Sequence, residues 1–191
     1  MTRRLIFLTH ADVVQDPKTP VPDWGLSDLG RARHDAFAAS DTIGGVTAVY
    51  ASTERKAREG AAPVAARLDL RVNAVAALGE NDRSATGYLP PDQFQAVADA
   101  FFAQPDTAVR GWERARAAQA RIAAALRTIA DLDPTAGDIL VVAHGGVGAL
   151  WRCLLKGIEI TRAEDQTGGN GGCWFSTGIG TWEAPGAWVR V

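Results

Sequence analysis

The stretch Arg3-Arg4-Leu5-Ile6-Phe7-Leu8-Thr9-His10-Ala11-Asp12 decides the fold of this chain. Its four consecutive apolar residues lie between a basic pair and a polar loop. They predict a strand that is buried on both faces, because a strand covered by helices on both sides shows no alternation of polar and apolar residues. His10 follows that strand directly. Since ligands bind beyond the carboxyl ends of the strands in open α/β sheets, we expect His10 at the functional edge of the sheet.

A second predicted strand, residues 138–143, also ends at a histidine. His144 follows it, and the next two residues are glycines, which allow the backbone to approach a ligand closely. His10 and His144 are two of the 3 histidines in the chain. The third, His34, falls in a predicted helix, where we expect a surface or packing role. The two strand-end histidines are therefore predicted to serve one site.

Strands and helices alternate along the rest of the chain. We expect further strands over residues 46–51 and 70–75, and helices over residues 27–40, from 52 or 53 to 68, 92–102, 111–131 and about 147–155. The predicted buried face of the first helix consists of Leu29, Ala32, Ala36 and Phe37. Glycine-separated tryptophans near the carboxyl end predict short strands that close one sheet edge as a hairpin. Together these elements predict a three-layer α/β/α sandwich around a mostly parallel central sheet.

Length and charge limit the possible partners. We expect one domain over residues 1–191, long enough to bury a sizeable core. With 20 Lys and Arg against 22 Asp and Glu, the chain lacks the basic surplus that nucleic-acid binding requires. No long apolar window or signal-like segment indicates a membrane, so we expect a cytoplasmic protein. Cys153 and Cys173 have neither disulfide-framework nor zinc-ligand spacing, and we expect reduced thiols. The oligomeric state stays open.

Two loops flank the predicted site. The loop at residues 13–24 contains three prolines, which we expect to stiffen it over the site. The run Gly168-Gly169-Asn170-Gly171-Gly172 is read mainly as a mobile loop, and the alternative is an anion cradle of backbone N–H groups. Trp112 and Glu113 are interpreted as structural, because Trp112 continues an apolar helix stripe.

Four elements converge on the predicted edge: His10, residues 52–56, Glu80 and His144. Imidazole nitrogens, guanidinium donors and the positive start of a helix together favour a bound anion such as a phosphoryl group. A carboxylate does not hold phosphate, but it serves as a general acid when a bound anion and desolvation favour its protonated form. The set therefore indicates phosphoryl transfer through a histidine nucleophile.

These motifs resemble the histidine phosphatase superfamily, which has the phosphoglycerate-mutase-like fold. That family carries Arg-His-Gly after its first strand, a serine-initiated helix with a phosphate-binding arginine, a mid-chain acid, and His-Gly-Gly or a near variant after a later strand. The matching segments run in the same order over essentially the whole chain: Thr9-His10-Ala11, Ser52-Thr53-Glu54-Arg55-Lys56-Ala57, Glu80 and His144-Gly145-Gly146-Val147. A weaker match is Leu26-Ser27-Asp28-Leu29-Gly30.

The resemblance implies a metal-independent phosphomonoesterase that needs no cofactor and acts on a small phosphorylated molecule. His10 would attack phosphorus and become phosphohistidine. Glu80 would protonate the leaving oxygen and then activate water, while Arg55 and His144 would hold the phosphoryl oxygens. Further candidates for phosphate binding are Ser52, Arg58 and Arg83. Asp82 is the competing acid for the role of Glu80.

The chain departs from the family pattern at two positions. Thr9 stands where the family has an arginine, and losing a charge-assisted hydrogen bond costs roughly 1.5–3 kcal/mol, or about ten- to a hundredfold in rate. Candidates to replace that charge are Arg83, Arg58 and Lys18. In addition, the usual spacing of the helix arginine falls on Lys56, about 100° around a helix from Arg55. We favour Arg55 because guanidinium binds phosphate through two hydrogen bonds.

Three other functions are weighed against hydrolysis. A non-catalytic protein that binds phosphate or a phosphorylated ligand is the main alternative, because Thr9 marks a lost arginine. A metallohydrolase fits less well, since no His-x-Asp or His-Glu-x-x-His cluster is present. A mutase is less expected as well, because a short chain without long insertions has little to close over the site between two phosphoryl transfers.

Overall fold

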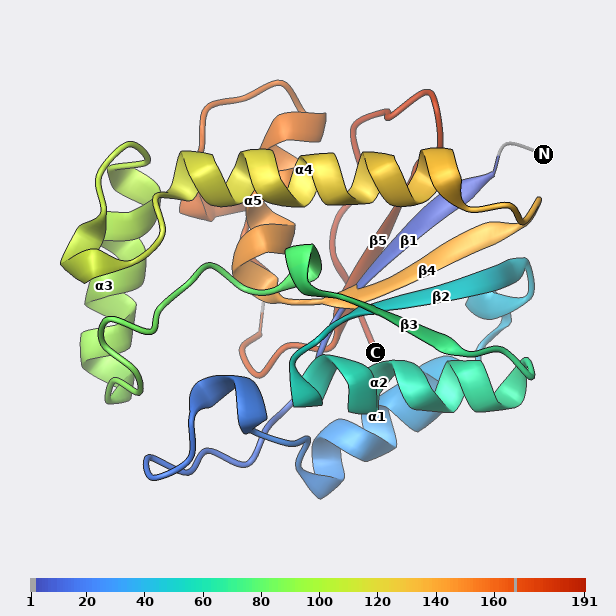
Figure 1. Ribbon diagram of the computed structural model, residues 1–191, viewed down its shortest axis with the longest axis horizontal. Coiled ribbons are helices and arrows are strands. Elements are labelled where there is room, and N and C mark those ends of the chain that lie inside the picture. Colours follow the sequence, from blue (N-terminus) through green and yellow to red (C-terminus); the bar gives the residue numbers. More distant parts are fainter. Residues whose placement is uncertain (1–2, 167) are drawn as a thin grey trace.

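A computed structural model describes residues 3–166 and 168–191, which form a six-stranded sheet with helices on both faces (Figure 1). The strand order is β3 (Val72–Val75), β2 (Val46–Ser52), β4 (Asp138–Ala143), β1 (Arg4–Thr9), β5 (Cys173–Gly178) and β6 (Val189–Arg190). The strands β3, β2, β4 and β1 run parallel to one another, β5 pairs antiparallel with β1, and β6 pairs antiparallel with β5. The predicted α/β fold with a mostly parallel sheet is confirmed, as is the antiparallel closure of one edge.

Helices cover the sheet in two layers, as Figure 1 shows. One layer consists of α1 (Asp28–Ala38) and α2 (Arg55–Arg67), and the other contains α4 (Ala115–Leu132) and α5 (Gly145–Leu155). The helix α3 (Pro91–Ala103) packs at the side of the second layer. Short 3-10 turns connect these elements: η1 (Val21–Asp23), η2 (Asp41–Ile43), η3 (Ala76–Leu78), η4 (Val109–Gly111) and η5 (Arg162–Glu164).

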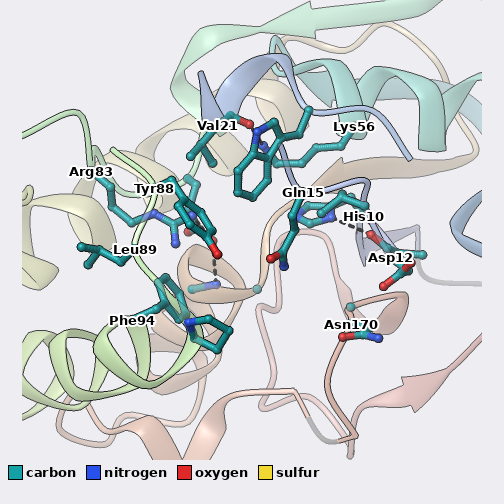
Figure 2. Close-up of a pocket in the computed structure, with 18 of the residues that line it drawn as sticks. His10, Asp12, Gln15, Val21, Lys56, Arg83, Tyr88, Leu89, Phe94 and Asn170 are labelled. Atoms are coloured by element: carbon teal, nitrogen blue, oxygen red, sulfur yellow. Dashed lines mark hydrogen bonds and ion pairs between the residues drawn. The ribbon is translucent and has the colours of Figure 1, made fainter. Parts of the chain in front are cut away.

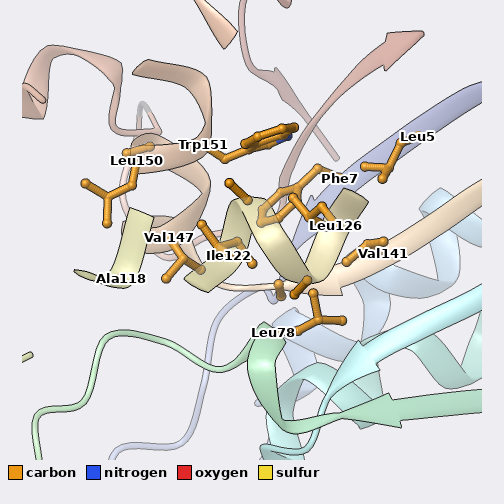
Figure 3. Packing of buried hydrophobic residues seen from close by; sticks show 14 of the residues in the cluster. Leu5, Phe7, Leu78, Ala118, Ile122, Leu126, Val141, Val147, Leu150 and Trp151 are labelled. Carbon is orange, nitrogen blue, oxygen red and sulfur yellow. The ribbon is translucent and has the colours of Figure 1, made fainter. Parts of the chain in front are cut away.

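Strand β1 is buried on both faces, as predicted. Leu5 and Phe7 point into the core beneath α4 and α5, where Figure 3 shows them near Leu126 and Trp151. Ile6 and Leu8 belong to the core on the other face, with α1 and α2. Burying each such side chain contributes roughly 1.5–3 kcal/mol, so the strand is held at the centre of the molecule from both sides.

Helix α1 buries a different face from the one predicted. Ser27 caps it as expected, because its hydroxyl accepts a hydrogen bond from the Gly30 N–H at 3.1 Å. However, Leu29 is 57% exposed, Ala32 and Ala36 are exposed, and Phe37 alone of the four predicted residues is buried. The inward face also carries two polar side chains, Arg33 and His34. The prediction was wrong because it counted apolar residues only.

The buried polar face of α1 is stabilised by distant backbone groups. The Arg33 guanidinium donates to the carbonyls of Gly171 at 2.8 Å, Gly172 at 3.0 Å and Val191 at 2.9 Å. Since a buried polar group is tolerated when its hydrogen bonds are made, these carbonyls explain the burial of a charged side chain. They also connect α1 to the chain that follows residue 167.

The register of β1 against β4 places the two strand ends together. Thr9 is aligned with Ala143, and the His10 N–H donates to the Ala143 carbonyl at 3.0 Å. His10 and His144 therefore leave the sheet side by side, with ring centroids 5.2 Å apart. The prediction that both histidines lie at one sheet edge is confirmed.

Two further features concern the whole of the described chain. Its helices are too short or too polar to cross a lipid bilayer. Cys153 and Cys173 are both buried, and residues 3–166 and 168–191 contain no disulfide.

Candidate active site

A cavity of about 450 Å³ opens at the carboxyl ends of β1 and β4 (Figure 2). Its lining comes from the loop after β1, the start of α2, the segment from Glu80 to Gln95, the first turn of α5, and Asp165, Gln166, Asn170 and Gly171. The cavity brings together His10, Glu80 and Arg83 from the predicted set. Segments far apart in the sequence thus converge where open α/β sheets bind ligands.

The imidazole of His10 is oriented by a hydrogen bond from Nδ1, which leaves the Nε2 lone pair available. Its Nδ1 lies 2.9 Å from the Ala11 carbonyl oxygen, which can only accept, so Nδ1 carries the proton and Nε2 keeps its lone pair. Burial and the nearby charge of Lys56 lower the pKa of His10 to about 4. His10 is therefore neutral at pH 7 and has the tautomer that a nucleophilic Nε2 requires.

His34 supports the same loop from α1. Its Nε2 accepts a hydrogen bond from the Ala11 N–H at 3.0 Å, and the side chain is only 1% exposed. Burial, with the neighbouring Arg33 charge, lowers the pKa of His34 to about 4, so the ring remains an acceptor at neutral pH. Its ring occupies the space beside Gly60, where an added Cβ would lie 2.6 Å from the imidazole. The predicted packing role is confirmed, but the hydrogen bond to the His10 loop was not foreseen.

Glu80 is fixed at the start of α5. Its carboxylate accepts hydrogen bonds from the N–H groups of Gly146 at 3.1 Å and Val147 at 3.0 Å. A helix N-terminus favours a negative charge, which explains the position of this acid. Glu80 lines the cavity, whereas the competing Asp82 is exposed outside it and accepts from the Ser84 N–H at 2.8 Å.

His144 is fully buried, lies with its ring centroid 5.2 Å from that of His10, and does not line the cavity. Its Nε2 is 3.2 Å from a Glu54 carboxylate oxygen, but the direction is unsuitable for a hydrogen bond, and neither ring nitrogen has a hydrogen-bond partner among the described residues. Burial lowers the pKa of His144 to about 3, so the ring is neutral. One ring nitrogen therefore carries an N–H that has no acceptor among residues 3–166 and 168–191.

Glu54 is a site residue that the sequence analysis missed. Its carboxylate contacts the Lys56 amino group and accepts a hydrogen bond from the Glu80 N–H at 3.0 Å. Burial opposes its ionisation, but the contacts with His144 and Lys56 lower its pKa to about 2. No local signal separates Glu54 from an ordinary helix-start acid, because its partners come from distant segments.

Lys56, and not Arg55, faces the cavity. The Lys56 side chain is 3% exposed and its amino group donates to the Val21 carbonyl at 2.9 Å. Arg55 is 60% exposed, lies outside the cavity and donates to the Glu59 carboxylate at 2.7 Å. The choice of Arg55 was wrong because its position on the first turn of α2 directs it to solvent, one step of about 100° from Lys56.

Ser52 and Arg58 do not line the cavity either. Ser52 is fully buried, and its hydroxyl accepts from the Glu54 N–H at 3.2 Å. Arg58 is exposed on α2, and Lys18 is exposed in the proline-containing loop. Of the three candidates to replace a charge at position 9, Arg83 alone is part of the cavity lining.

Thr9 itself directs no donor into the cavity. Its hydroxyl donates to the Gln166 side-chain oxygen at 2.7 Å and accepts from the Cys173 N–H at 3.0 Å, and the residue is fully buried. Arg83 lies with its guanidinium 5.2 Å from the Phe94 ring centre and 3.8 Å from the Glu80 carboxylate. Planar contact with an aromatic face is typical of arginine and directs its N–H groups sideways.

The glycine run is tied to the His10 loop. The Gly172 N–H donates to the His10 carbonyl at 2.9 Å, and Asn170 and Gly171 line the cavity. Gly171 has a φ of +62°, and an added Cβ would lie 2.0 Å from the His10 carbonyl oxygen. Only glycine fits at this position, and the run supports the backbone on which His10 is mounted.

Carboxylates outnumber cations around the cavity. Asp12, Glu80 and Asp165 are the acidic lining residues, and Lys56 and Arg83 are the permanent cations. Burial raises the pKa of Asp165. Within residues 3–166 and 168–191, no group of three or more histidine, cysteine or acidic side chains has an arrangement that could hold a metal ion.

Comparisons with known proteins agree with this geometry. The sequence profile of the histidine phosphatase superfamily (branch 1) matches residues 6–174. A search of curated proteins returned no match. Mycobacterial glucosyl-3-phosphoglycerate phosphatase in complex with inorganic phosphate is 23% identical, with 98% of this chain and 94% of that chain covered and a TM-score of 0.76.

Two other solved structures share the fold. YhfR of Bacillus stearothermophilus is 19% identical over 99% of this chain and 95% of its own, with a TM-score of 0.79. A putative alpha-ribazole-5'-P phosphatase of Escherichia coli is 19% identical over 98% and 96%, with a TM-score of 0.69. At these identities, the similarity supports the architecture and leaves the substrate open.

Proposed function

The chain belongs to the histidine phosphatase superfamily, and from this premise we propose that it hydrolyses phosphate monoesters through a phosphohistidine at His10. One observation carries the proposal. The Ala11 carbonyl holds Nδ1 of a neutral His10, which leaves Nε2 as a nucleophile beside a cavity that also contains an acid. A positioned, unprotonated imidazole is what attack on phosphorus requires.

The reaction has two displacements. His10 Nε2 attacks phosphorus, the ester P–O bond breaks, and protonated Glu80 gives its proton to the leaving oxygen. The Glu80 carboxylate then takes a proton from water, the oxygen of that water attacks phosphorus, and the P–N bond breaks to release phosphate and neutral His10.

Three side chains hold the phosphoryl oxygens in this proposal. Lys56 and Arg83 supply positive charge, and His144 supplies an N–H. The ring nitrogens of His144 have no hydrogen-bond partner in the described part of the chain, and the ring lies 5.2 Å from that of His10 by centroids. This supports the role, because a phosphoryl oxygen would satisfy a buried donor. Charge-assisted contacts of this kind are the stronger hydrogen bonds in proteins.

A second candidate function is binding of a phosphorylated ligand without turnover. It is favoured by Thr9, which places a hydroxyl where the resemblance has an arginine and uses that hydroxyl within the protein. It is also favoured by the pairing of Lys56 with Glu54, which uses part of the positive charge near His10. Both features reduce the positive charge that would stabilise the transferring phosphoryl group. Binding of a phosphorylated ligand depends on that charge less than turnover does.

Hydrolysis of an aryl phosphate with excess chelator, between pH 5 and 8, tests the proposal. We expect turnover by the wild type, none by His10→Ala, and a loss of roughly a hundredfold or more in Glu80→Gln, since general acid–base catalysis contributes about 10²–10⁴-fold. Leu29→Ala, an exposed change on α1, is the matched control. Calorimetric binding of phosphate without turnover would favour the second candidate. Loss of turnover on chelation would instead indicate a metal-dependent reaction.

A further inference from the structure

One side of the cavity is an apolar and aromatic wall. It consists of Val21, Trp24, Tyr88, Leu89, Pro91 and Phe94. Figure 2 shows Val21, Tyr88, Leu89 and Phe94 gathered on one side together with Arg83, while His10, Asp12, Gln15 and Asn170 lie on the other. Phosphoryl transfer uses none of the wall residues, because a phosphoryl group is bound by charges and polar hydrogens. The wall is therefore available to the rest of the substrate.

The wall is held in place by contacts within the protein. Trp24 is 8% exposed, and its indole N–H donates to the carbonyls of Asp16 at 2.9 Å and Thr19 at 3.0 Å. The Trp24 and Tyr88 rings lie 5.8 Å apart by centroids, and Phe94 lies 5.9 Å from Trp112. A surface of fixed rings binds flat apolar groups with little loss of side-chain entropy.

The charges that remain around the cavity oppose a negatively charged leaving group. Lys56 contacts Glu54 and its charge acts on His10. Arg83 lies 3.8 Å from Glu80 with its guanidinium over the Phe94 ring, and in the proposed reaction both cations are used by the phosphoryl group. The other charged lining residues among those described are Asp12 and Asp165. Arg162 approaches Asp165 to 3.8 Å but lies outside the lining and pairs with Asp99. A carboxylate on the leaving group would thus meet like charges.

We infer that the substrate is a phosphate monoester of an aromatic alcohol that carries no negative charge. The inference rests on the proposed function and extends it to the leaving group. The phosphoryl group lies between His10, Lys56 and Arg83, and the aromatic ring lies on the wall formed with Trp24 and Tyr88. A cavity of about 450 Å³ is of the size that proteins use for ligands of this kind.

Three primary-alcohol esters test the inference: ethyl phosphate, benzyl phosphate and 4-(phosphooxymethyl)benzoate. Each releases a primary alcohol, so differences in kcat/KM report contacts of the leaving group. We expect benzyl phosphate to exceed ethyl phosphate about tenfold or more, and the benzoate to fall about tenfold below benzyl phosphate. Equal values for the first two esters, or preference for the benzoate, would overturn the inference.

Variants assign these preferences to residues. Tyr88→Ala, or Phe94→Leu if the former does not fold, is expected to lower the ratio of benzyl to ethyl phosphate about tenfold. Asp165→Asn is expected to raise kcat/KM for the benzoate relative to benzyl phosphate. Leu29→Ala is the control and keeps both ratios. Unchanged ratios in the wall and Asp165 variants would contradict the placement of the leaving group.

Calorimetry with the same three esters separates this inference from the proposed hydrolysis. Tighter binding of benzyl phosphate than of the other two, without turnover of any ester, would sustain the inference while hydrolysis fails. Turnover of all three esters at equal kcat/KM would support the proposed hydrolysis and overturn the inference about the leaving group. Absence of both binding and turnover for all three esters would overturn the inference together with the proposed function.

Discussion

At the scale of residues, Lys56 and Arg55 are adjacent in the sequence, but one side chain is buried and the other is exposed to solvent. Lys56 is 3% exposed beside the cavity, whereas Arg55 is 60% exposed and paired with Glu59. A charge-assisted contact contributes about 1.5–3 kcal/mol, so we expect Lys56→Met to lower kcat/KM for an aryl phosphate about ten- to a hundredfold. Arg55→Ala, which removes only an exposed pair, is expected to leave kcat/KM within about twofold.

The stability of the Lys56 variant needs its own control. Removing one partner of a buried ion pair costs about 3–5 kcal/mol, because Glu54 is left unpaired. The double variant Glu54→Gln/Lys56→Met should recover stability in urea unfolding while kcat/KM stays below that of the wild type. Loss of activity in Arg55→Ala, with Lys56→Met active, would show that the assignment of the cation is wrong.

His34 acts on the reaction through the backbone. It accepts the Ala11 N–H, and the Ala11 carbonyl in turn orients His10. His34→Ala leaves a buried N–H unsatisfied, which costs about 1–3 kcal/mol, and we expect lower kcat with little change in KM. His34→Gln offers an oxygen near the place of Nε2 and should restore most of kcat. If both variants lose kcat equally, the ring contributes packing and not orientation.

At the scale of elements, the loop after β1 depends on the glycine run that packs against it. Gly171 and Gly169 have similar φ values of +62° and +64°, but only at Gly171 would a Cβ meet the His10 carbonyl, at 2.0 Å. Alanine at a positive φ costs roughly 1–2 kcal/mol. We therefore expect Gly169→Ala to lose about that much stability, and Gly171→Ala to lose more and to reduce kcat sharply.

The Gly169→Ala and Gly171→Ala variants are a matched pair, which we compare by urea unfolding and by kcat. The strain of the backbone is common to both, so the difference in unfolding free energy reports the contact with the His10 loop. Equal losses of stability and unchanged kcat in Gly171→Ala would mean that the loop adjusts without moving the imidazole.

At the scale of the whole molecule, the fold keeps all 3 histidines neutral. The pKa of buried His34 falls from 6.5 to about 4, so the unfolded chain binds a proton in that range and the folded chain does not. The contribution of His34 to the free energy of unfolding is therefore fully present above pH 6.5. It falls as the pH drops towards 4, by roughly 3 kcal/mol for this one group. His10 and His144 act in the same direction.

Urea unfolding of the wild type and His34→Gln between pH 7.5 and 4 measures this effect. The wild type should lose stability steadily below pH 6.5, and the variant should lose less because one of the titrating groups is gone. Identical pH dependence of the two proteins would indicate that His34 is accessible to protons in the folded state.

The elements that the sequence predicted well share a physical basis. The apolar run Leu5–Leu8 and residues 138–143 could form only buried strands, and adjacent parallel strands place His10 and His144 at one edge. Helical spacing likewise predicted helices over residues 92–102 and 111–131, where the structure has α3 and α4. These features depend on local period and burial, which a single sequence records directly.

The sequence by itself determined the α/β architecture, the two histidines at one sheet edge and an acid, Glu80, that lines the cavity together with His10. Only the tertiary structure decided that Lys56 replaces Arg55, that Glu54 joins the site, and that α1 turns His34 inward. The physical reason is that apolar burial follows a local pattern, whereas a buried polar side chain is stabilised by partners that lie far away in the sequence.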